Sequence, residues 1–392
     1  MTNFKWMSLT LLFACLTSCS FREIPPPTPT LAPLSTPTPP PTPAAALTPT
    51  ISPTPAPTAT PVIVVERGQL PPGFSLTVYA GIPAPTRLAF GPDGKLYVAG
   101  DRKVEVFWDP DGDGHASPVT VFADNLPDTP LGLLWVGERL YVSYNHTVVA
   151  MQDTNGDLIQ DRSFIVRDNL PTGLHQNDGM VLGADGYIYL GLGSTCDACL
   201  EESHLSASVL RFKPDGSDLS VFASGLRNPY GIAFNAAGDL FVTDNGRDEL
   251  GRDLPAEELN HIRSGLDYGW PNCWEGNTAP LCADKAGAVV GFEAHSSVDG
   301  MVFYNADNNF PPEYRDNAFV AVFGSYLFPE IERGVKRIQL TKQGEAYTGE
   351  AEWFLQMGVN GRPLDVTVGP DGALYVADFM NSAVYRIVYG AP

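Results

Sequence analysis

Four polar residues lie just before apolar, strand-like segments, and their types suit acid–base and anion-binding chemistry. His175 stands in GLHQNDG, Arg227 and Asn228 stand in GLRNPYGIAF, and Arg362 stands in GRPLDVTV. A neutral imidazole can serve as a general base near neutral pH, and a guanidinium group can bind a carboxylate through two hydrogen bonds. The pattern indicates a site for an anionic ligand beside a base. The alternative is that these are ordinary loop residues.

The stretch from Gly225 to Pro271 surrounds two of these residues and carries an unusually long acidic loop. A strand-like segment runs into the turn DNGRDELGRD, and the loop ends at DYGWP. Loops of this length inside a folded domain are uncommon and are more often functional than not. Binding residues also concentrate on loops that a rigid scaffold presents. We therefore expect the active site to be built here.

Two further segments copy the opening ligand spacing of a calcium-binding loop. They are DPDGDG, beginning at Asp109, and DTNGD, beginning at Asp153. Neither has a Glu at the twelfth position, where such loops place their bidentate ligand. Asp161 falls at the ninth position of the second loop. Asp-Gly turns between strands explain both segments without a metal, and we favour that interpretation.

One unit recurs six times and must position these residues. Each copy is a short apolar strand, a turn rich in Asp, Asn or Gly, and a second strand with β-branched and aromatic residues. The copies are Leu88–Gly100, Leu133–Tyr144, Met180–Gly193, Ile232–Gly246, Met301–Gly324 and Val366–Phe379. Repeats of strands and turns at a spacing of about fifty residues predict a β-propeller, so we expect an all-β fold with six blades. Phe74–Ala80 precedes the first copy and is expected to complete the blade formed by Ala383–Tyr389.

Composition excludes some classes of partner. The 392 residues include 24 Lys plus Arg and 45 Asp plus Glu, which gives a net charge of −21 and a pI near 4.5. A chain this acidic is poorly suited to bind nucleic acid or an anionic membrane surface. Polar small molecules remain compatible with it.

The first 62 residues predict export and a spacer. Lys5 precedes a short apolar run, Leu9–Leu16, which is too short to cross a bilayer. Residues 16–19, LTSC, match a lipobox, so we predict a lipoprotein signal peptide over 1–19 and a membrane anchor on Cys19, on the extracytoplasmic side. The alternative is a plain secretory signal. Residues 20–62 are rich in Pro and Thr and predict a disordered, polyproline-like linker, followed by the propeller over 63–392.

The cysteines of the predicted propeller fall into two close pairs. Cys196 and Cys199 are three residues apart, and Cys273 and Cys282 are nine apart. An exported protein favours oxidation, so we expect two local disulfides. A zinc site formed by all four is the alternative.

Several strings taken together resemble one known family. They are LPPGFSLTVYAG, HQNDG, GLGSTCDAC, GLRNPYGIAF, TDNGRDELGRDLPAEELN, DYGWP and GRPLDVTVGPDG. Their order is similar to that in the glucose/sorbosone dehydrogenase family, especially its sorbosone and pyranose dehydrogenase branch, and the likeness covers roughly Leu70 to the C-terminus. GPDG turns occur in many propellers, whereas RNPYG, NGRDELG and YGWP in this order are specific. The resemblance implies a six-bladed propeller enzyme that uses pyrroloquinoline quinone (PQQ) and calcium.

The resemblance also implies roles for individual residues around the quinone. His175 matches the base that takes the proton of a sugar hydroxyl while hydride passes to the quinone. Arg227 and Asn228 match residues that hold the cofactor near its quinone oxygens. Arg362 matches a residue on the carboxylate side of the cofactor.

Three further residues match the calcium site and a second histidine position. The backbone carbonyls of Gly246 and Arg247 match those that bind the calcium ion, which acts as a Lewis acid. His295, in AHSSVDG, lies where the branch also places a histidine, and is a second candidate for cofactor binding.

The chain departs from the family pattern at two places. Leu364 stands where some members have a second arginine, and Tyr326-Leu327-Phe328 replaces a Trp-Asn-Arg string. Two cationic contacts to the cofactor are therefore absent, and Arg333 or Lys336 compensates only if its loop folds inward.

The sequence thus predicts a PQQ-dependent dehydrogenase for a sugar or a related alcohol or aldehyde. The predicted partners are a small sugar substrate and an external electron acceptor, because no haem-attachment CxxCH is present. Membrane contact is expected only through the lipid anchor. The alternative is a non-catalytic propeller that binds carbohydrate or a protein partner.

Overall fold

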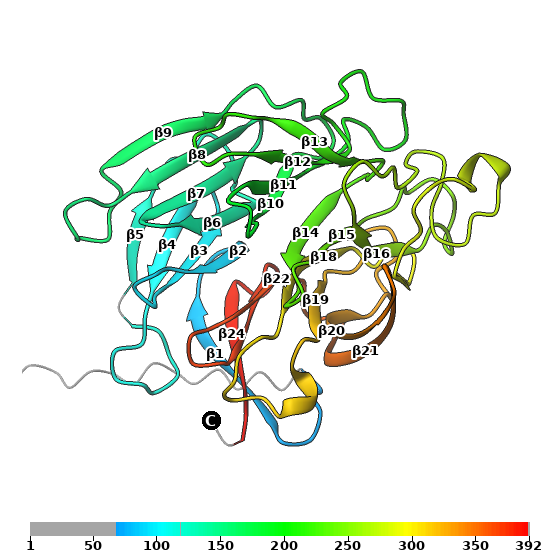
Figure 1. Cartoon of the computed structure of the whole chain (residues 1–392). Coiled ribbons are helices and arrows are strands. Elements are labelled where there is room, and N and C mark those ends of the chain that lie inside the picture. The colour runs from blue at the N-terminus through cyan, green and yellow to red at the C-terminus, as the bar shows by residue number, and fades with distance from the viewer. Residues whose placement is uncertain (1–67, 118, 391–392) are drawn as a thin grey trace, which may run out of the picture. The chain divides into compact units, whose positions relative to one another are not determined.

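Six four-stranded antiparallel sheets surround a common axis in a computed structural model of the chain (Figure 1). The structure describes residues 68–117 and 119–390, all within the unit Thr60–Pro392. The sheets are the six blades that the repeats predict, so the predicted six-bladed β-propeller is confirmed. The predicted signal peptide and linker lie outside the described residues.

The first three blades are built from strands that follow one another along the chain, innermost strand first. They are β2 (Pro85–Phe90), β3 (Leu96–Gly100), β4 (Lys103–Phe107) and β5 (Val119–Ala123); β6 (Gly132–Val136), β7 (Arg139–Tyr144), β8 (Thr147–Gln152) and β9 (Arg162–Arg167); and β10 (Asn177–Leu182), β11 (Ile188–Leu192), β12 (Ser208–Phe212) and β13 (Ser220–Ser224).

The last three blades follow the same plan, except that the sixth takes its outer strand from the other end of the chain. They are β14 (Pro229–Phe234), β15 (Leu240–Asp244), β16 (Glu257–Ile262) and β17 (Val290–Phe292); β18 (Val298–Phe303), β19 (Ala318–Val322), β20 (Arg333–Gln343) and β21 (Ala346–Gly358); and β22 (Pro363–Val368), β23 (Leu374–Asp378), β24 (Ala383–Tyr389) and β1 (Phe74–Gly81).

The six repeats seen in the sequence are the two innermost strands of each blade. In the first, the turn between β2 and β3 is closed by the Gly91 amide, which donates to the Lys95 carbonyl at 2.8 Å. Strand β1 pairs with β24 from Phe74–Tyr389 to Gly81–Ala383. The expected completion of the sixth blade by the N-terminal strand is therefore also confirmed.

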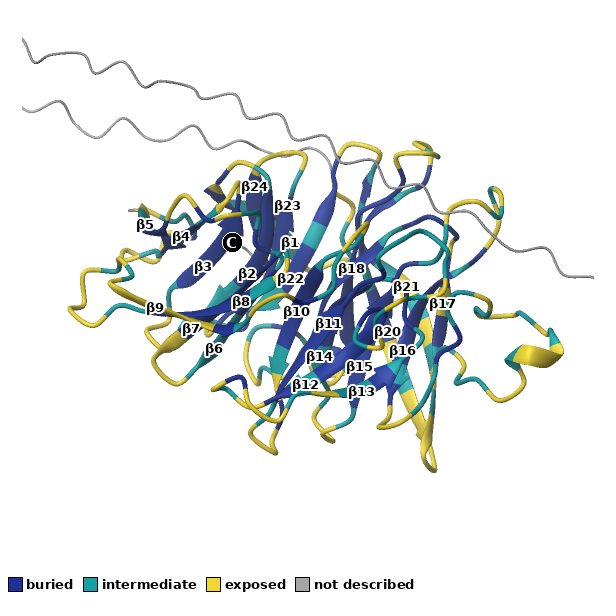
Figure 2. Cartoon of the chain, turned by 90° about the horizontal axis from the view of Figure 1, so that it is seen from above, coloured by how far each residue is buried: buried dark blue, intermediate teal, exposed yellow. Residues whose placement is uncertain are grey.

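The hydrophobic core is divided among the contacts between blades. Six clusters of buried side chains are present in the described part of the chain, and each spans two neighbouring blades. Figure 2 shows the buried strands in the middle of the blades and the exposed residues in the loops and the β20–β21 hairpin. Because the blades are held by their neighbours, the loops at the ends of the inner strands are free to carry a site.

A buried arginine connects several blades near the centre of the propeller. Arg87, on β2, pairs with Asp365 on β22 at 3.2 Å and also donates to the backbone carbonyls of Leu131 and Tyr230. It thereby connects the first, second, fourth and sixth blades. Asp178 and Asp299 lie buried beside it, and burial raises the pKa of Asp299 to about 7.

Only two helices occur in residues 68–117 and 119–390, the 3-10 turns η1 (Pro280–Cys282) and η2 (Pro312–Tyr314). None of the described helices has the length and apolar character that a membrane span requires. The two expected disulfides, Cys196–Cys199 and Cys273–Cys282, are both present.

Candidate active site

A polar cleft of about 220 Å³ opens among the loops of the third, fourth and fifth blades. Five of the residues that the sequence singles out line it: His175, Arg227, Asn228, Gly246 and His295. The opposite wall is the loop that follows β19, from Phe323 to Leu327. The candidate residues therefore come together in space although more than one hundred residues separate the first from the last.

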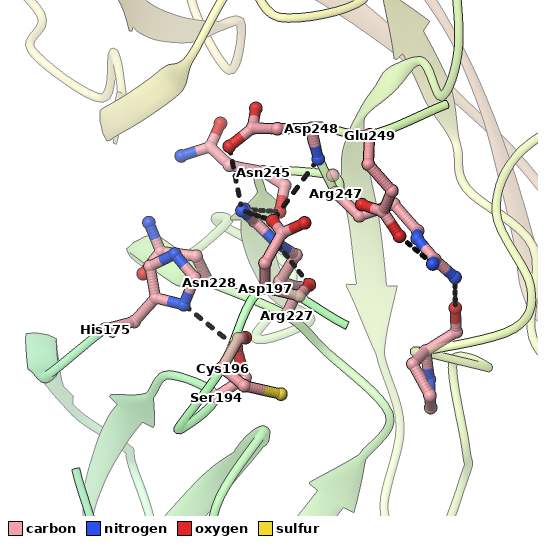
Figure 3. A network of polar contacts seen from close by, with 12 residues as sticks. His175, Ser194, Cys196, Asp197, Arg227, Asn228, Asn245, Arg247, Asp248 and Glu249 are labelled. Carbon is pink, nitrogen blue, oxygen red and sulfur yellow. Dashed lines mark hydrogen bonds and ion pairs between the residues drawn. The ribbon is translucent and has the colours of Figure 1, made fainter. Parts of the chain in front are cut away.

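His175 is held in the cleft by the ends of β10 and β11. Its backbone amide donates to the Ser194 carbonyl at 3.1 Å, and its Nδ1 lies 2.9 Å from the Ser194 Oγ. Gly193 makes this approach possible, because a Cβ there would lie 2.3 Å from the Cβ of His175. Figure 3 shows the imidazole facing Ser194, with Cys196 on the far side of that serine.

The Ser194 hydroxyl fixes the tautomer of His175. Its single proton is donated to the carbonyl of Cys196 at 2.7 Å. Toward His175 the same oxygen can only accept, so Nδ1 carries the imidazole proton. Nε2 is then left with a free lone pair. Burial and the positive charge of Arg227 lower the pKa of His175 to about 3, so the ring is neutral at neutral pH and Nε2 carries no proton.

Arg227 is anchored on all sides by the chain itself. Its guanidinium pairs with Asp197 at 2.6 Å and Asp248 at 3.3 Å, and also donates to the carbonyls of Asp197 and Asn245 (Figure 3). Asp197 lies inside the loop closed by the Cys196–Cys199 disulfide. The charge of Arg227 is therefore compensated within the site, and its place is set by the disulfide loop.

Asn228 offers the cleft an unused amide. Asp244 accepts the backbone amides of both Arg227 and Asn228, at 3.1 and 2.7 Å. The side-chain amide of Asn228 makes no hydrogen bond with any residue that the structure describes, and it lines the cleft. It is free to bind a ligand oxygen.

The carbonyl groups of Gly246 and Arg247 suit a hard cation. The Gly246 amide donates to the carboxyl of Glu257, whereas neither residue's carbonyl accepts a hydrogen bond from the described part of the chain. Carbonyl and carboxylate oxygens are the ligands that Ca²⁺ prefers. The side chain of Arg247 turns toward Glu249 and the Pro271 carbonyl (Figure 3). Gly246 itself lines the cleft, so a calcium ion fits the residues present there.

Glu257 is a cleft residue that the sequence reasoning missed. It is buried on β16, and burial raises its pKa to about 8, so the carboxyl is protonated at neutral pH. The string PAEELN gave no indication of its direction, because successive side chains of a strand point to opposite faces.

His295 is fixed at both ring nitrogens. Nε2 lies 2.8 Å from the Gly251 carbonyl, and Nδ1 lies 3.5 Å from a carboxylate oxygen of Asp248. Its ring also packs on Phe328, with the ring centroids 4.9 Å apart. His295 therefore orders the acidic loop beside the cleft, and both nitrogens are already in use.

Arg362 lies behind the cleft wall instead of lining it. Its guanidinium donates to the carbonyl of Ser325 at 3.1 Å and lies 4.0 Å from the centroid of the Tyr326 ring. Arg333 reaches the back of the same wall, since its side chain packs on Gly324. Lys336 does not, because it stacks on Trp353 at 4.0 Å. Of the two compensating residues considered from the sequence, only Arg333 folds inward.

In the two calcium-like loops the first aspartate accepts several backbone amides. Asp109 accepts the amides of Gly112, Asp113 and Gly114, and Asp153 accepts those of Asn155, Gly156 and Leu158. These contacts close a turn at the first position of each loop. Three carboxylates, of Asp109, Asp111 and Asp113, do lie close together in the first loop.

Fold and site together define a six-bladed propeller with a polar cleft where three blades meet. A family model described as a domain of unknown function (DUF7133) matches residues 65–386, and the chain belongs to that family.

The proteins similar to this chain include two curated proteins and one solved structure. Aldose sugar dehydrogenase YliI of Escherichia coli is 25% identical over 338 residues, which cover 74% of this chain and 86% of that protein. An uncharacterised protein of Borreliella burgdorferi is 28% identical over 189 residues, 43% of this chain, and the match spans about half (48%) of that relative. The holo form of the pyranose dehydrogenase PQQ domain from Coprinopsis cinerea superposes with a TM-score of 0.70 at 16% identity, over 82% of this chain and 97% of that one. The resemblance stated from the motifs is confirmed.

Proposed function

We propose that the chain is a dehydrogenase that oxidises a sugar, or a related alcohol or aldehyde, with PQQ as cofactor and His175 as base. The observation that carries the proposal is the contact between Nδ1 of His175 and the Ser194 hydroxyl, which leaves Nε2 without a proton, in a cleft that Arg227 and Asn228 also line. The similarity to YliI and to the Coprinopsis PQQ domain supports it.

The residues present fit the cofactor. The free amide of Asn228 and the guanidinium of Arg227 suit quinone oxygens, and the carbonyls of Gly246 and Arg247 suit calcium. Arg362 supplies positive charge for a carboxylate behind the opposite wall. When bound, the quinone supplies the two-electron acceptor for the hydrogen that leaves the substrate carbon, and calcium supplies a Lewis acid.

The protein's own part is to orient the substrate and move one proton. The Nε2 lone pair of His175 accepts the hydroxyl proton as the substrate's C–O bond becomes C=O, so the ring passes from neutral to positively charged. Asp197, one of the carboxylates that hold Arg227, also acts on His175 in the direction that stabilises the cationic imidazole.

The site is tested first by cofactor binding. Purified protein is titrated with PQQ and calcium while absorbance and melting temperature are followed. A calcium-dependent rise in melting temperature, with bleaching of the quinone on addition of aldoses, supports the proposal. A protein that shows no shift at saturating cofactor is not a PQQ enzyme. His175→Gln is expected to abolish turnover and leave the PQQ affinity within about twofold, because Gln keeps a polar side chain of similar length.

We further propose that the protein is exported and anchored by a lipid on Cys19, and that it passes electrons to an external acceptor. The two disulfides support an oxidising compartment. Cys19→Ala is expected to move the protein from the membrane fraction to the soluble extracytoplasmic fraction. If it stays with the membrane, the anchor lies elsewhere.

A non-catalytic carbohydrate-binding propeller is the second candidate. Tyr326 and Leu327 line the cleft and are 73% and 60% exposed, so an aromatic ring is available to stack on a sugar. Sugar binding without added quinone, with no turnover in its presence, favours this candidate over the dehydrogenase.

A further inference from the structure

Two buried arginines beside the cleft have no carboxylate partner. Residues 68–117 and 119–390 contain five arginines that are less than one-tenth exposed. Three of them pair with Asp or Glu within the chain, namely Arg87, Arg227 and Arg337. No ion pair joins Arg333 or Arg362 to any described residue, although they are only 4% and 7% exposed. Buried charges are ordinarily paired.

The contacts of these two guanidinium groups are carbonyl groups and aromatic rings. Arg333 donates to the carbonyls of Val359 at 2.7 Å and Pro329 at 3.3 Å, and its Nε–H has no partner. Arg362 donates to the carbonyls of Ser325 and Phe323. Carbonyl groups satisfy hydrogen-bond donors, but they do not neutralise the charge.

The two positive charges act on each other. Burial, and then the charge of Arg362, lower the pKa of Arg333. Asp378 is the nearby carboxylate, but it accepts the backbone amides of Arg362, Met380 and Asn381 and forms no ion pair with either guanidinium. The pair therefore retains unneutralised positive charge, which an anionic ligand would stabilise.

An exposed aromatic ring lies between the Arg362 guanidinium and the cleft. Tyr326 lines the cleft, is 73% exposed, and lies over the Arg362 guanidinium at 4.0 Å. Gly324, two residues before Tyr326, has a φ of +82°, and a Cβ there would lie 2.6 Å from the Cγ and Nε of Arg333. Gly324, which lines the cleft, therefore packs directly on Arg333, and the exposed Tyr326 ring packs on Arg362 through a cation–π contact.

We infer that Arg333 and Arg362 form a two-arginine subsite for a carboxylate, with Tyr326 as its cover. Arg333 supplies the second positive charge of this subsite. Leu364, at the position where some members of the resembled family have an arginine, supplies none. The identity of the ligand rests on the proposed function, because the quinone carries carboxylates, whereas the subsite itself rests on the unpaired charges. Binding requires the Tyr326 ring to leave the face of Arg362, so the cover lowers affinity for any ligand that does not displace it.

The test measures binding by the purified full-length protein without turnover. Calorimetry is performed with PQQ and, separately, with benzene-1,3,5-tricarboxylate in metal-free buffer. Arg333→Met is expected to weaken binding by tenfold or more. Lys336→Met, on the same strand but stacked on Trp353, is the matched control and is expected to bind as wild type does. Tyr326→Ala, an exposed change that is not expected to impair folding, should bind the tricarboxylate several-fold more tightly.

The outcomes separate this subsite from the proposed function. One outcome is that wild type binds the tricarboxylate but not PQQ, and that Arg333→Met no longer binds the tricarboxylate. This outcome supports the subsite and overturns the PQQ proposal. PQQ binding that is equally tight in Arg333→Met and wild type overturns the subsite and leaves the PQQ proposal standing. Wild type that binds neither ligand overturns both. Unchanged or weaker tricarboxylate binding by Tyr326→Ala overturns its role as the cover, even if Arg333→Met fails to fold.

Discussion

Replacing Ser194 by alanine removes the side-chain contact that sets the tautomer of His175. The backbone contacts of this segment, His175 to Ser194 and Ser194 to Arg227, do not involve the hydroxyl and remain. The Nδ1–H would then be buried without an acceptor, which costs about 1–3 kcal/mol. The ring avoids this cost by moving its proton to Nε2, which faces the cleft. Since about 1.4 kcal/mol corresponds to a factor of ten, this cost favours the tautomer with its proton on Nε2, which cannot act as a base, by roughly 5- to 150-fold.

The expected result is a fall in kcat of the same size, roughly 5- to 150-fold, with the Kd for PQQ within about twofold. Nitrogen NMR of ¹⁵N-histidine reports the tautomer directly and does not depend on turnover. His175 is identified among the six histidines as the signal lost in His175→Gln. In wild type its Nδ1 should be protonated and its Nε2 bare from pH 5 to pH 8, since the pKa is lowered to about 3.

Ser206→Ala is the control, because this buried serine bonds to the Pro171 carbonyl and does not contact the histidine. It should leave both the NMR signal and kcat unchanged. The reasoning is refuted if wild-type His175 carries its proton on Nε2, or if it titrates near pH 6.5. It is also refuted if Ser194→Ala changes the tautomer without lowering kcat, since the lone pair on Nε2 would then not matter.

Three further changes test other parts of the structure. The pKa of Asp299 is raised to about 7, so its stabilising contribution is complete at low pH and is lost as pH rises toward 7. Urea denaturation at pH 5 and at pH 8 gives the free energy of unfolding of wild type and of Asp299→Asn. Between these pH values the free energy of wild type should fall by roughly 2–3 kcal/mol more than that of the variant. Gly324→Ala should destabilise the protein by more than about 1–2 kcal/mol, the usual cost of a left-handed backbone, because the new Cβ also meets Arg333. Cys199→Ser should lower PQQ affinity several-fold by releasing the loop that holds Asp197 against Arg227.

The results that would contradict these three expectations are equally specific. Parallel stability curves for wild type and Asp299→Asn across pH would show that this carboxyl titrates normally. Gly94→Ala is the control for Gly324→Ala, since it has positive φ but open space around its Cβ, and equal effects would remove the steric argument. Unchanged PQQ affinity after Cys199→Ser would show that Asp197 holds its place without the disulfide.

The fold was predictable from the sequence because it repeats a local signal. The Asp-Gly turns between paired apolar segments mark the inner hairpins, and six copies fix the number of blades. The completion of the sixth blade by Phe74–Gly81 was also accessible, since one strand was left over at each end of the chain.

The sequence predicted most of the residues that form the site, but only part of how their side chains lie. The positions before the inner strands bring His175, Arg227 and Asn228 together, as expected from the repeat. Ser194 and Asp197 escaped notice because their contacts depend on how the disulfide loop folds back over the cleft. The position of Arg362 behind Tyr326 depends on how a loop of another blade packs, and no local pattern encodes such packing between segments.

The closure of the ring by β1 and β24 sets the order in which the molecule can fold. Ser75 on β1 and Gly390 beside β24 contact each other across a separation of 315 residues. During synthesis the N-terminal strand emerges first, and it must remain without its partner until nearly the whole chain has followed. Pairing over such a distance is slow, and an unpaired strand edge is prone to aggregate. The ring can therefore close only after both ends of the chain have been made, and the sixth blade lacks its outer strand until then.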